Sequence, residues 1–222
     1  RSMGILNGDY FTMLGSCGLD CLGDIVINPY AYQTERSYEP ITVQDLTAMA
    51  GKPRSIDASI ELARLSLAGT QNKCGLFHDP KAPLGDGWYQ PVGGAPSNYI
   101  IKFAREDLHD LMIVEHLSLT CAAACGVPSA KTALLNPSRP IICVERYDRL
   151  GSASEVINGQ VAPLRQHQED ITQAFGIMPE AKYRQLEPNT VTVLADFFRN
   201  SSANPAQDIA NLTRLLLFNY LI

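Results

Sequence analysis

The stretch SNYIIKFA, at residues 97–104, is the most informative part of this sequence. It is rich in β-branched and aromatic residues and follows the turn sequence GGAP at 93–96, which together predict a strand. Side chains alternate along a strand, so Lys102 lies on the face opposite Ile101 and Phe103. An unpaired buried ammonium is very costly, so Lys102 either reaches solvent from an edge strand or pairs with an anion. From this strand alone, the edge position is the simpler interpretation.

The preceding residues predict the neighbouring strands of a sheet. A small-residue turn leads into a strand at 74–77, the sequence Asp86-Gly87 signals a turn, and 88–91 forms the return strand. The result is a hairpin followed by the strand at 97–104, which indicates an antiparallel sheet. Further towards the N-terminus, Thr42 is a suitable cap for a short helix.

A helix is predicted for residues 107–126, where Gly126 and the following proline end it. Its apolar stripe contains Leu108, Leu111, Met112 and Leu119. Glu115 lies on this stripe, and a carboxylate in that position needs a cation. Lys102 is the nearest candidate in sequence, so we predict an ion pair between the two. The alternative is a solvated Glu115 at the edge of the stripe.

The rest of the chain moves from strands to helices. A short strand is expected at Ile25–Ile27, further strands at 129–135 and 140–149, a polar loop at 151–159, and helices beginning near Asp170 and covering 190–198 and 208–222. The fold class is therefore α+β, with an antiparallel sheet followed by a helical part.

Composition excludes several classes of function. The 222 residues carry a net charge of −5 and no basic run, so direct binding of nucleic acid is not indicated. Apolar residues make up 45% of the chain, but no apolar run is long enough to cross a bilayer, and no signal-peptide pattern begins the chain. These features predict a cytoplasmic protein without membrane contact.

The cysteines do not form a recognisable metal motif. They are Cys17, Cys21, Cys74, Cys121, Cys125 and Cys143. Two pairs have four-residue spacing, whereas zinc sites commonly use a two-residue gap with further ligands nearby. We therefore expect buried thiols in a reducing cytosol and no metal site. A cysteine-based metal or redox protein would require bound zinc or a thiol of low pKa.

Five motifs, in order, resemble the HipA family of bacterial toxin serine/threonine kinases. They are SLAGTQNK at 66–73, YIIK at 99–102, Glu115 with GVP at 126–128, VERYDR at 144–149, and HQED with QAFG between 167 and 176. The resemblance implies a protein-kinase-like fold, with the sheet as N-lobe and the helices as the beginning of a C-lobe. It divides the chain into the end of an N-terminal domain (1–50), the N-lobe and hinge (51–149) and a truncated helical C-lobe (150–222).

The resemblance also implies an ATP site. The loop residues Ala68, Gly69, Thr70 and Gln71 would cover the phosphates with backbone N–H groups. Lys102 would contact the α- and β-phosphates, held by Glu115, while Glu145 and Tyr147 in the hinge would bind the adenine.

Two further sequence features gain an interpretation from the family. Ser66 matches a loop serine that is autophosphorylated in some members, and a phosphate there would repel the ATP phosphates and switch the enzyme off. The alternative is an ordinary turn hydroxyl. The HQED sequence at 167–170 is expected to have a structural role, because Glu169 and Asp170 suit the start of a helix.

The family's catalytic aspartate and Mg²⁺ ligands are expected beyond Ile222, so no catalytic or metal-binding residue is assigned within this chain. The 222-residue species is accordingly expected to have little kinase activity. The parent protein would use ATP and Mg²⁺ to phosphorylate a translation factor such as an aminoacyl-tRNA synthetase. It would bind a HipB-type DNA-binding antitoxin and contact DNA only through that partner. The alternative is a non-catalytic half-kinase that binds nucleotide or antitoxin.

Overall fold

The structure is a computed structural model, and the part of the chain that it describes is residues 18–28, 35–50, 73–104, 110–136, 139–151, 155–178, 181 and 189–222. The chain divides into two compact units, Arg1–Leu117 with Ala130–Gln168, and Ser118–Ser129 with Glu169–Ile222. The domain boundaries predicted after residues 50 and 149 do not coincide with this division and remain predictions.

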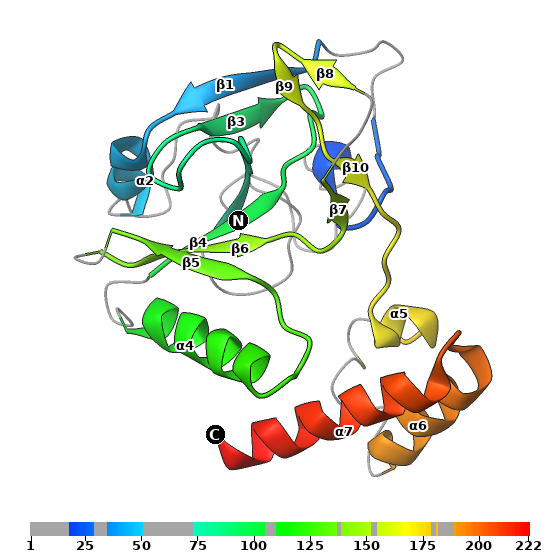
Figure 1. Cartoon of the computed structure of the whole chain (residues 1–222). Coiled ribbons are helices and arrows are strands. Elements are labelled where there is room, and N and C mark those ends of the chain that lie inside the picture. Colours follow the sequence, from blue (N-terminus) through cyan, green and yellow to red (C-terminus); the bar gives the residue numbers. More distant parts are fainter. Residues whose placement is uncertain are drawn as a thin grey trace. The chain divides into compact units, whose positions relative to one another are not determined.

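A six-stranded antiparallel sheet forms the first unit (Figure 1). In spatial order the strands are β1 (Ser37–Ile41), β3 (Trp88–Val92), β2 (Lys73–His78), β4 (Tyr99–Phe103), β6 (Ile141–Glu145) and β5 (Thr132–Leu135). The predicted hairpin of β2 and β3 and the predicted strand β4 are confirmed. Because β4 lies between β2 and β6, the edge-strand interpretation of Lys102 is wrong.

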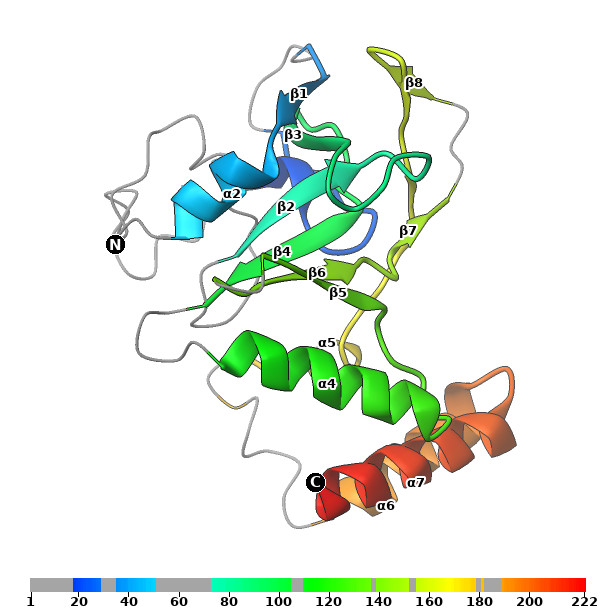
Figure 2. The ribbon, with the colours of Figure 1, turned by 60° about the vertical axis from the view of Figure 1, so that its left-hand side comes forward.

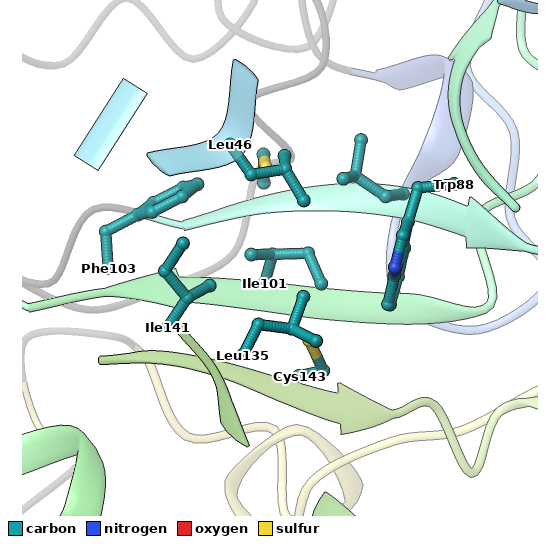
Figure 3. Close-up of a cluster of buried hydrophobic side chains, with 9 residues drawn as sticks. Leu46, Trp88, Ile101, Phe103, Leu135, Ile141 and Cys143 are labelled. Carbon is teal, nitrogen blue, oxygen red and sulfur yellow. The ribbon is translucent and has the colours of Figure 1, made fainter. Parts of the chain in front are cut away.

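The main core lies on one face of this sheet, under helix α2 (Val43–Ala50) (Figure 3). Leu46 of α2 packs against Trp88, Ile101 and Phe103, and each of these four side chains is nearly or fully buried. Ile101 and Phe103 are alternate residues of β4, as the strand period requires. Lys102 therefore projects from the opposite face, away from this core.

Thr42 caps α2 as predicted. Its Oγ1 accepts a hydrogen bond from the backbone N–H of Asp45 at 3.1 Å, and the Asp45 carboxylate accepts the backbone N–H of Thr42 at 2.9 Å. This reciprocal arrangement satisfies two N–H groups that the first turn of a helix leaves without partners. Thr42 thus fixes the point at which the chain leaves β1 and covers the core.

Smaller elements complete the first unit. They are η1 (Gly18–Asp20) and two short antiparallel pairs, β7 (Arg149–Leu150) with β10 (Leu164–Arg165), and β8 (Val156–Ile157) with β9 (Gln160–Val161). The prediction of a polar loop at 151–159 is wrong in part, because strand β8 lies within this range. The strand predicted at Ile25–Ile27 is also wrong, because these residues have no regular structure and Ile25 is exposed.

The second unit is helical. Its helices include α5 (Ile171–Ala174), α6 (Thr190–Ser201) and α7 (Pro205–Leu221), and α6 lies beside α7 (Figures 1 and 2). Asp170 caps α5 as expected, because its carboxylate accepts the Gln173 N–H at 2.9 Å. None of the helices in the described residues is long and apolar enough to cross a membrane.

Gly93, in the turn between β3 and β4, offers a test of this fold. Its φ is +63°, and a Cβ there would lie 2.1 Å from the carbonyl oxygen of Glu35. We expect Gly93→Ala to destabilise the protein by roughly 1–3 kcal/mol or more, measured by urea unfolding. Gly85→Ala is the control, because a Cβ at Gly85 meets nothing within 4 Å. Equal stability of the two variants would contradict the described turn.

Candidate functional site

The predicted ion pair is present on the face of the sheet opposite the core. Lys102 Nζ, on β4, pairs with Glu115 Oε1 on helix α4 (Leu111–Ala124). Both side chains are 22% exposed, so the pair is largely shielded but still open to a ligand. The solvated alternative for Glu115 is therefore wrong, and Lys102 is a charged group held in place at the centre of a sheet.

Glu115 lies in the first half of α4, the helix labelled in Figure 2. Met112, one turn earlier, is fully buried, and the adjacent His116 ring shares a 2.8 Å hydrogen bond with the Thr132 hydroxyl of β5. Leu111 is 37% exposed, so the predicted stripe does not form one buried face. Helix α4 is thus attached to the sheet by residues on either side of Glu115.

Lys73 is a site residue that the sequence alone did not reveal. It lies at the start of β2, in register with Lys102 on the neighbouring strand. Burial lowers the pKa of Lys73, and the charge of Lys102 lowers it further, while Glu115 acts in the opposite direction. The face therefore carries the ammonium groups of Lys73 and Lys102 next to each other, and ammonium groups can bind the oxygens of a phosphate. Only the pairing of β2 with β4 brings them together.

A low apolar surface extends from these charges towards the end of β6. Ile100 of β4 is in register with Gly75 of β2 and with Val144 of β6. Ile100 precedes Lys102 by two residues, so the two side chains share one face of β4. Gly75 contributes no side chain, and this leaves the middle of the surface without a bulky group. A flat, apolar ligand group can lie against such a surface.

The predicted hinge residues, Glu145 and Tyr147, lie at the end of β6 and just beyond it. Glu145 ends β6 in register with Tyr99, and its carboxylate lies 3.5 Å from the ammonium of Lys131. Tyr147 is 72% exposed, and its hydroxyl hydrogen-bonds the side chain of Gln168. The structure thus places Glu145 and Tyr147 at the end of the sheet, three and more residues along the strands from Lys102.

The other predicted site residues lie outside the described residues. They are Ser66, Ala68, Gly69, Thr70 and Gln71, which immediately precede Lys73 and β2 in the sequence. Their predicted roles in covering phosphates and in regulation stay predictions.

A buried network of charges lies next to the hinge. Asp148 accepts hydrogen bonds from Arg146 Nη2 at 2.8 Å, from Arg149 Nη1 at 2.9 Å and from the backbone N–H of Gly23 at 2.7 Å. Asp20 adds ion pairs to Arg149 at 2.9 Å and to Arg146 at 3.4 Å. Both arginine side chains are fully buried. This network ties the segment around Asp20 and Gly23 to the hinge.

The burial of the cysteines agrees only in part with the prediction. Cys74 and Cys143 are buried, and burial raises the pKa of the Cys143 thiol to about 12, which makes it unreactive. Cys121 and Cys125 are exposed, so the expectation of buried thiols is wrong for them. Cys17 lies outside the described residues. Within the described part of the chain, no group of three or more His, Cys, Asp or Glu residues could hold a metal.

Comparison with known proteins places this arrangement in a family. The family model of the HipA-like C-terminal domain matches residues 65–222. The serine/threonine-protein kinase toxin HipA of Shewanella oneidensis is 30% identical over 189 residues, covering 83% of this chain and 41% of that protein. The putative kinase Y4mE of Sinorhizobium fredii is 30% identical over 234 residues, covering 100% of this chain and 53% of its own length. The chain thus spans about half the length of these curated relatives.

A solved structure supports the same relationship. The chain matches HipA in a complex of Shewanella oneidensis HipA, HipB and operator DNA, with a TM-score of 0.62 and 29% identity, over 82% of this chain and 41% of that one. The α+β, protein-kinase-like fold predicted from the sequence is therefore confirmed. On these matches, and on the agreement of the Lys102–Glu115 pair with the predicted site, the chain belongs to the HipA-like C-terminal domain family.

Proposed function

We propose that this chain is the nucleotide-binding part of a HipA-type serine/threonine kinase toxin of a type II toxin–antitoxin system. The Lys102–Glu115 ion pair, with Lys73 in register beside Lys102, is the observation that supports this most directly. The two ammonium groups lie side by side in a partly shielded position. The phosphates of ATP would be attracted to them, and the attraction is stronger there than at an exposed surface.

The proposed nucleotide lies along the sheet from the hinge to the two lysines. Glu145 is in register with Tyr99, and Lys102 lies three residues further along β4, a distance of roughly 10 Å at 3.4 Å per residue. The adenine would be bound by the hinge backbone at Glu145 and Tyr147. The apolar surface of Ile100 would lie under the nucleoside, and the loop at 66–71 would cover the phosphates.

The chemical step proposed for the parent protein is transfer of the γ-phosphate to a serine. Mg²⁺, when bound, would supply positive charge that offsets the charge of the phosphoryl group during transfer. We assign no residue of this chain to the metal. The role of Lys102 and Lys73 is to hold the phosphates in place, and that of Glu115 is to orient Lys102. Phosphorylation of Ser66 would place a second anion beside the same lysines and oppose ATP binding.

The substrate and partners of the parent protein are part of the same proposal. A HipB-type DNA-binding antitoxin is supported by the related Shewanella oneidensis structure, in which HipA lies in a complex with HipB and operator DNA. The net charge of −5 favours a chain that meets DNA through this partner. An aminoacyl-tRNA synthetase, as a translation factor, is the proposed class of protein substrate in a cytoplasmic setting.

Titration with ATP, ADP and adenosine, followed by calorimetry, tests the nucleotide site. We expect ATP and ADP to bind at least about tenfold more tightly than adenosine, because the lysines contact phosphate oxygens. The difference should shrink as salt is added. Adenosine that binds as tightly as ATP, or a failure of all three to bind, would contradict the proposal.

A half-kinase without catalytic activity is the second candidate. No aspartate in the sequence is followed five residues later by an asparagine, the spacing expected for a catalytic aspartate and its metal-binding asparagine. We expect the 222-residue chain to bind ATP without transferring the γ-phosphate, as measured with radiolabelled ATP. Turnover at the rate of full-length HipA proteins would exclude the half-kinase interpretation.

A further inference from the structure

Two exposed cysteines lie at the C-terminal end of helix α4, in the second unit. Cys121 is in the last turn of this helix, and Cys125 directly follows it. Side chains four residues apart lie on one face of a helix, with Cβ atoms about 5–6 Å apart. The two thiols therefore reach the same part of the protein surface.

The end of α4 is closed in a way that keeps the two cysteines at this spacing. The Cys125 N–H donates to the Cys121 carbonyl at 2.9 Å, so the turn between them is fully helical. Gly126 follows with a φ of +74°, and the Val127 N–H donates to the Ala122 carbonyl at 2.9 Å. This is the Schellman arrangement that ends many helices. Ala122 and Val127 are also buried in one cluster with a side chain of α7, which anchors this turn.

The two thiols also interact with each other. Desolvation raises the pKa of the Cys125 thiol, and Cys121 raises it further through its charge and through a hydrogen bond between the two side chains. Cys125 therefore stays a thiol at neutral pH and is not a thiolate. A pair of thiols that already contact each other can be bridged by one atom without a large movement of the helix.

The number and state of these thiols restrict the bridging atom. A structural zinc ion needs four ligands, and among the described residues no group of three or more His, Cys, Asp or Glu could hold a metal. A metal ion would also have to displace both thiol protons, which the raised pKa of Cys125 opposes. A direct disulfide needs Cβ atoms about 3.5–4.5 Å apart, which is closer than one helical turn sets them.

We propose that Cys121 and Cys125 form a chelating site for a trivalent organoarsenical. Arsenic in such a compound carries one organic group and two hydroxyl groups. Each sulfur forms a bond to arsenic, each As–O bond breaks, and each thiol proton leaves with the released hydroxide as water. Arsenic stays trivalent, so the step needs no oxidant and no thiolate. The inference does not depend on the proposed function, because the pair lies in the second unit and Lys102 lies in the first.

Protection from alkylation tests this site on the intact, folded chain. Phenylarsine oxide, which water converts to the dihydroxy form, is added in stoichiometric amount and is followed by iodoacetamide. Digestion with trypsin then gives the peptide 106–131, which contains Cys121 and Cys125 and no other cysteine. Mass spectrometry should show both cysteines alkylated without the arsenical and both protected with it. A peptide that is alkylated equally in the two samples would overturn the proposal.

Variants distinguish chelation from the reaction of a single thiol. Cys121→Ala and Cys125→Ala should each raise the arsenical concentration that half-protects the remaining cysteine by at least about a hundredfold, because a chelate becomes a single bond. Cys125→Ala combined with Ala123→Cys keeps two cysteines at exposed positions but on different sides of the helix, and should behave like the single variants. Cys21→Ala, in the first unit, is the control and should change nothing. Equal half-protection of the single variants and the unmodified chain would refute the chelate.

Discussion

Replacing Lys102 by methionine is expected to weaken ATP binding by about two orders of magnitude. Methionine keeps most of the unbranched apolar stem but removes the ammonium group that pairs with Glu115. Loss of one partner from a shielded charge pair costs roughly 2–5 kcal/mol, of which part is the repulsion of phosphate by the remaining carboxylate. Calorimetric titration of the variant with ATP measures the change.

Two control variants separate the loss of the lysine–phosphate contact from the repulsion of phosphate by Glu115 and from a general loss of positive charge. Lys102→Met combined with Glu115→Gln removes the repulsion, and its affinity should recover only in part. Lys81→Met, at an exposed lysine in the turn between β2 and β3, should leave ATP binding unchanged. A Lys102→Met variant that melts normally and binds ATP like the unmodified chain would remove Lys102 from the site.

Asp148→Asn is expected to cause the largest loss of stability among the changes considered. Asp148 is 3% exposed and compensates two fully buried arginines, Arg146 and Arg149. Asparagine keeps the shape but leaves these guanidinium groups without one of the two carboxylates, Asp148 and Asp20, that pair with them. Breaking a buried pair in this way costs roughly 3–5 kcal/mol, which is a large fraction of the stability of a small protein.

Urea unfolding at neutral pH measures this loss, and Asp86→Asn, at an exposed turn aspartate, is the matched control. A variant of Asp148 with unchanged unfolding would show that the network contributes nothing to stability.

The same carboxylate gives the fold a dependence on pH. Burial by itself raises the pKa of Asp148, but hydrogen bonds from Arg146, with those of Gly23 and the charge of Arg149, outweigh burial and lower it. A group whose pKa is lower in the folded protein stabilises the fold above its unfolded pKa of about 3.9. The contribution is lost as pH falls below that value, and Asp148→Asn should flatten this part of the stability curve.

Local patterns in the sequence were sufficient for the central site residue. The alternation of Ile101, Lys102 and Phe103 placed the lysine on the face away from the core, and the stripe around Glu115 indicated its partner. Both inferences use the period of a single strand or helix. The N-terminal caps at Thr42 and Asp170 were predicted for the same reason, because a cap depends on neighbours within four residues.

Features that depend on the pairing of distant segments could not be predicted. Lys73 enters the site through the register of β2 with β4, which no local pattern fixes. Arg146 and Asp148 stand at the charged end of the strand predicted at 140–149, where side chains are commonly solvated, yet both residues are buried. Their partners, Asp20 and Gly23, are more than 100 residues away in the chain. Long-range charge networks of this kind become visible only in three dimensions.

The attachment of Asp20 and Gly23 to the hinge affects which fragments of such a protein can be expressed in folded form. A gene fragment that begins where the family match begins, at residue 65, would omit Asp20, the edge strand β1, and the carbonyl groups of Cys21 and Gly23 that accept from Arg149. Its translation product would carry surplus buried guanidinium groups and an uncovered β3. We expect such a product to aggregate when made alone and to be recovered by co-expression with a separate polypeptide covering residues 18–50, as in fragment complementation.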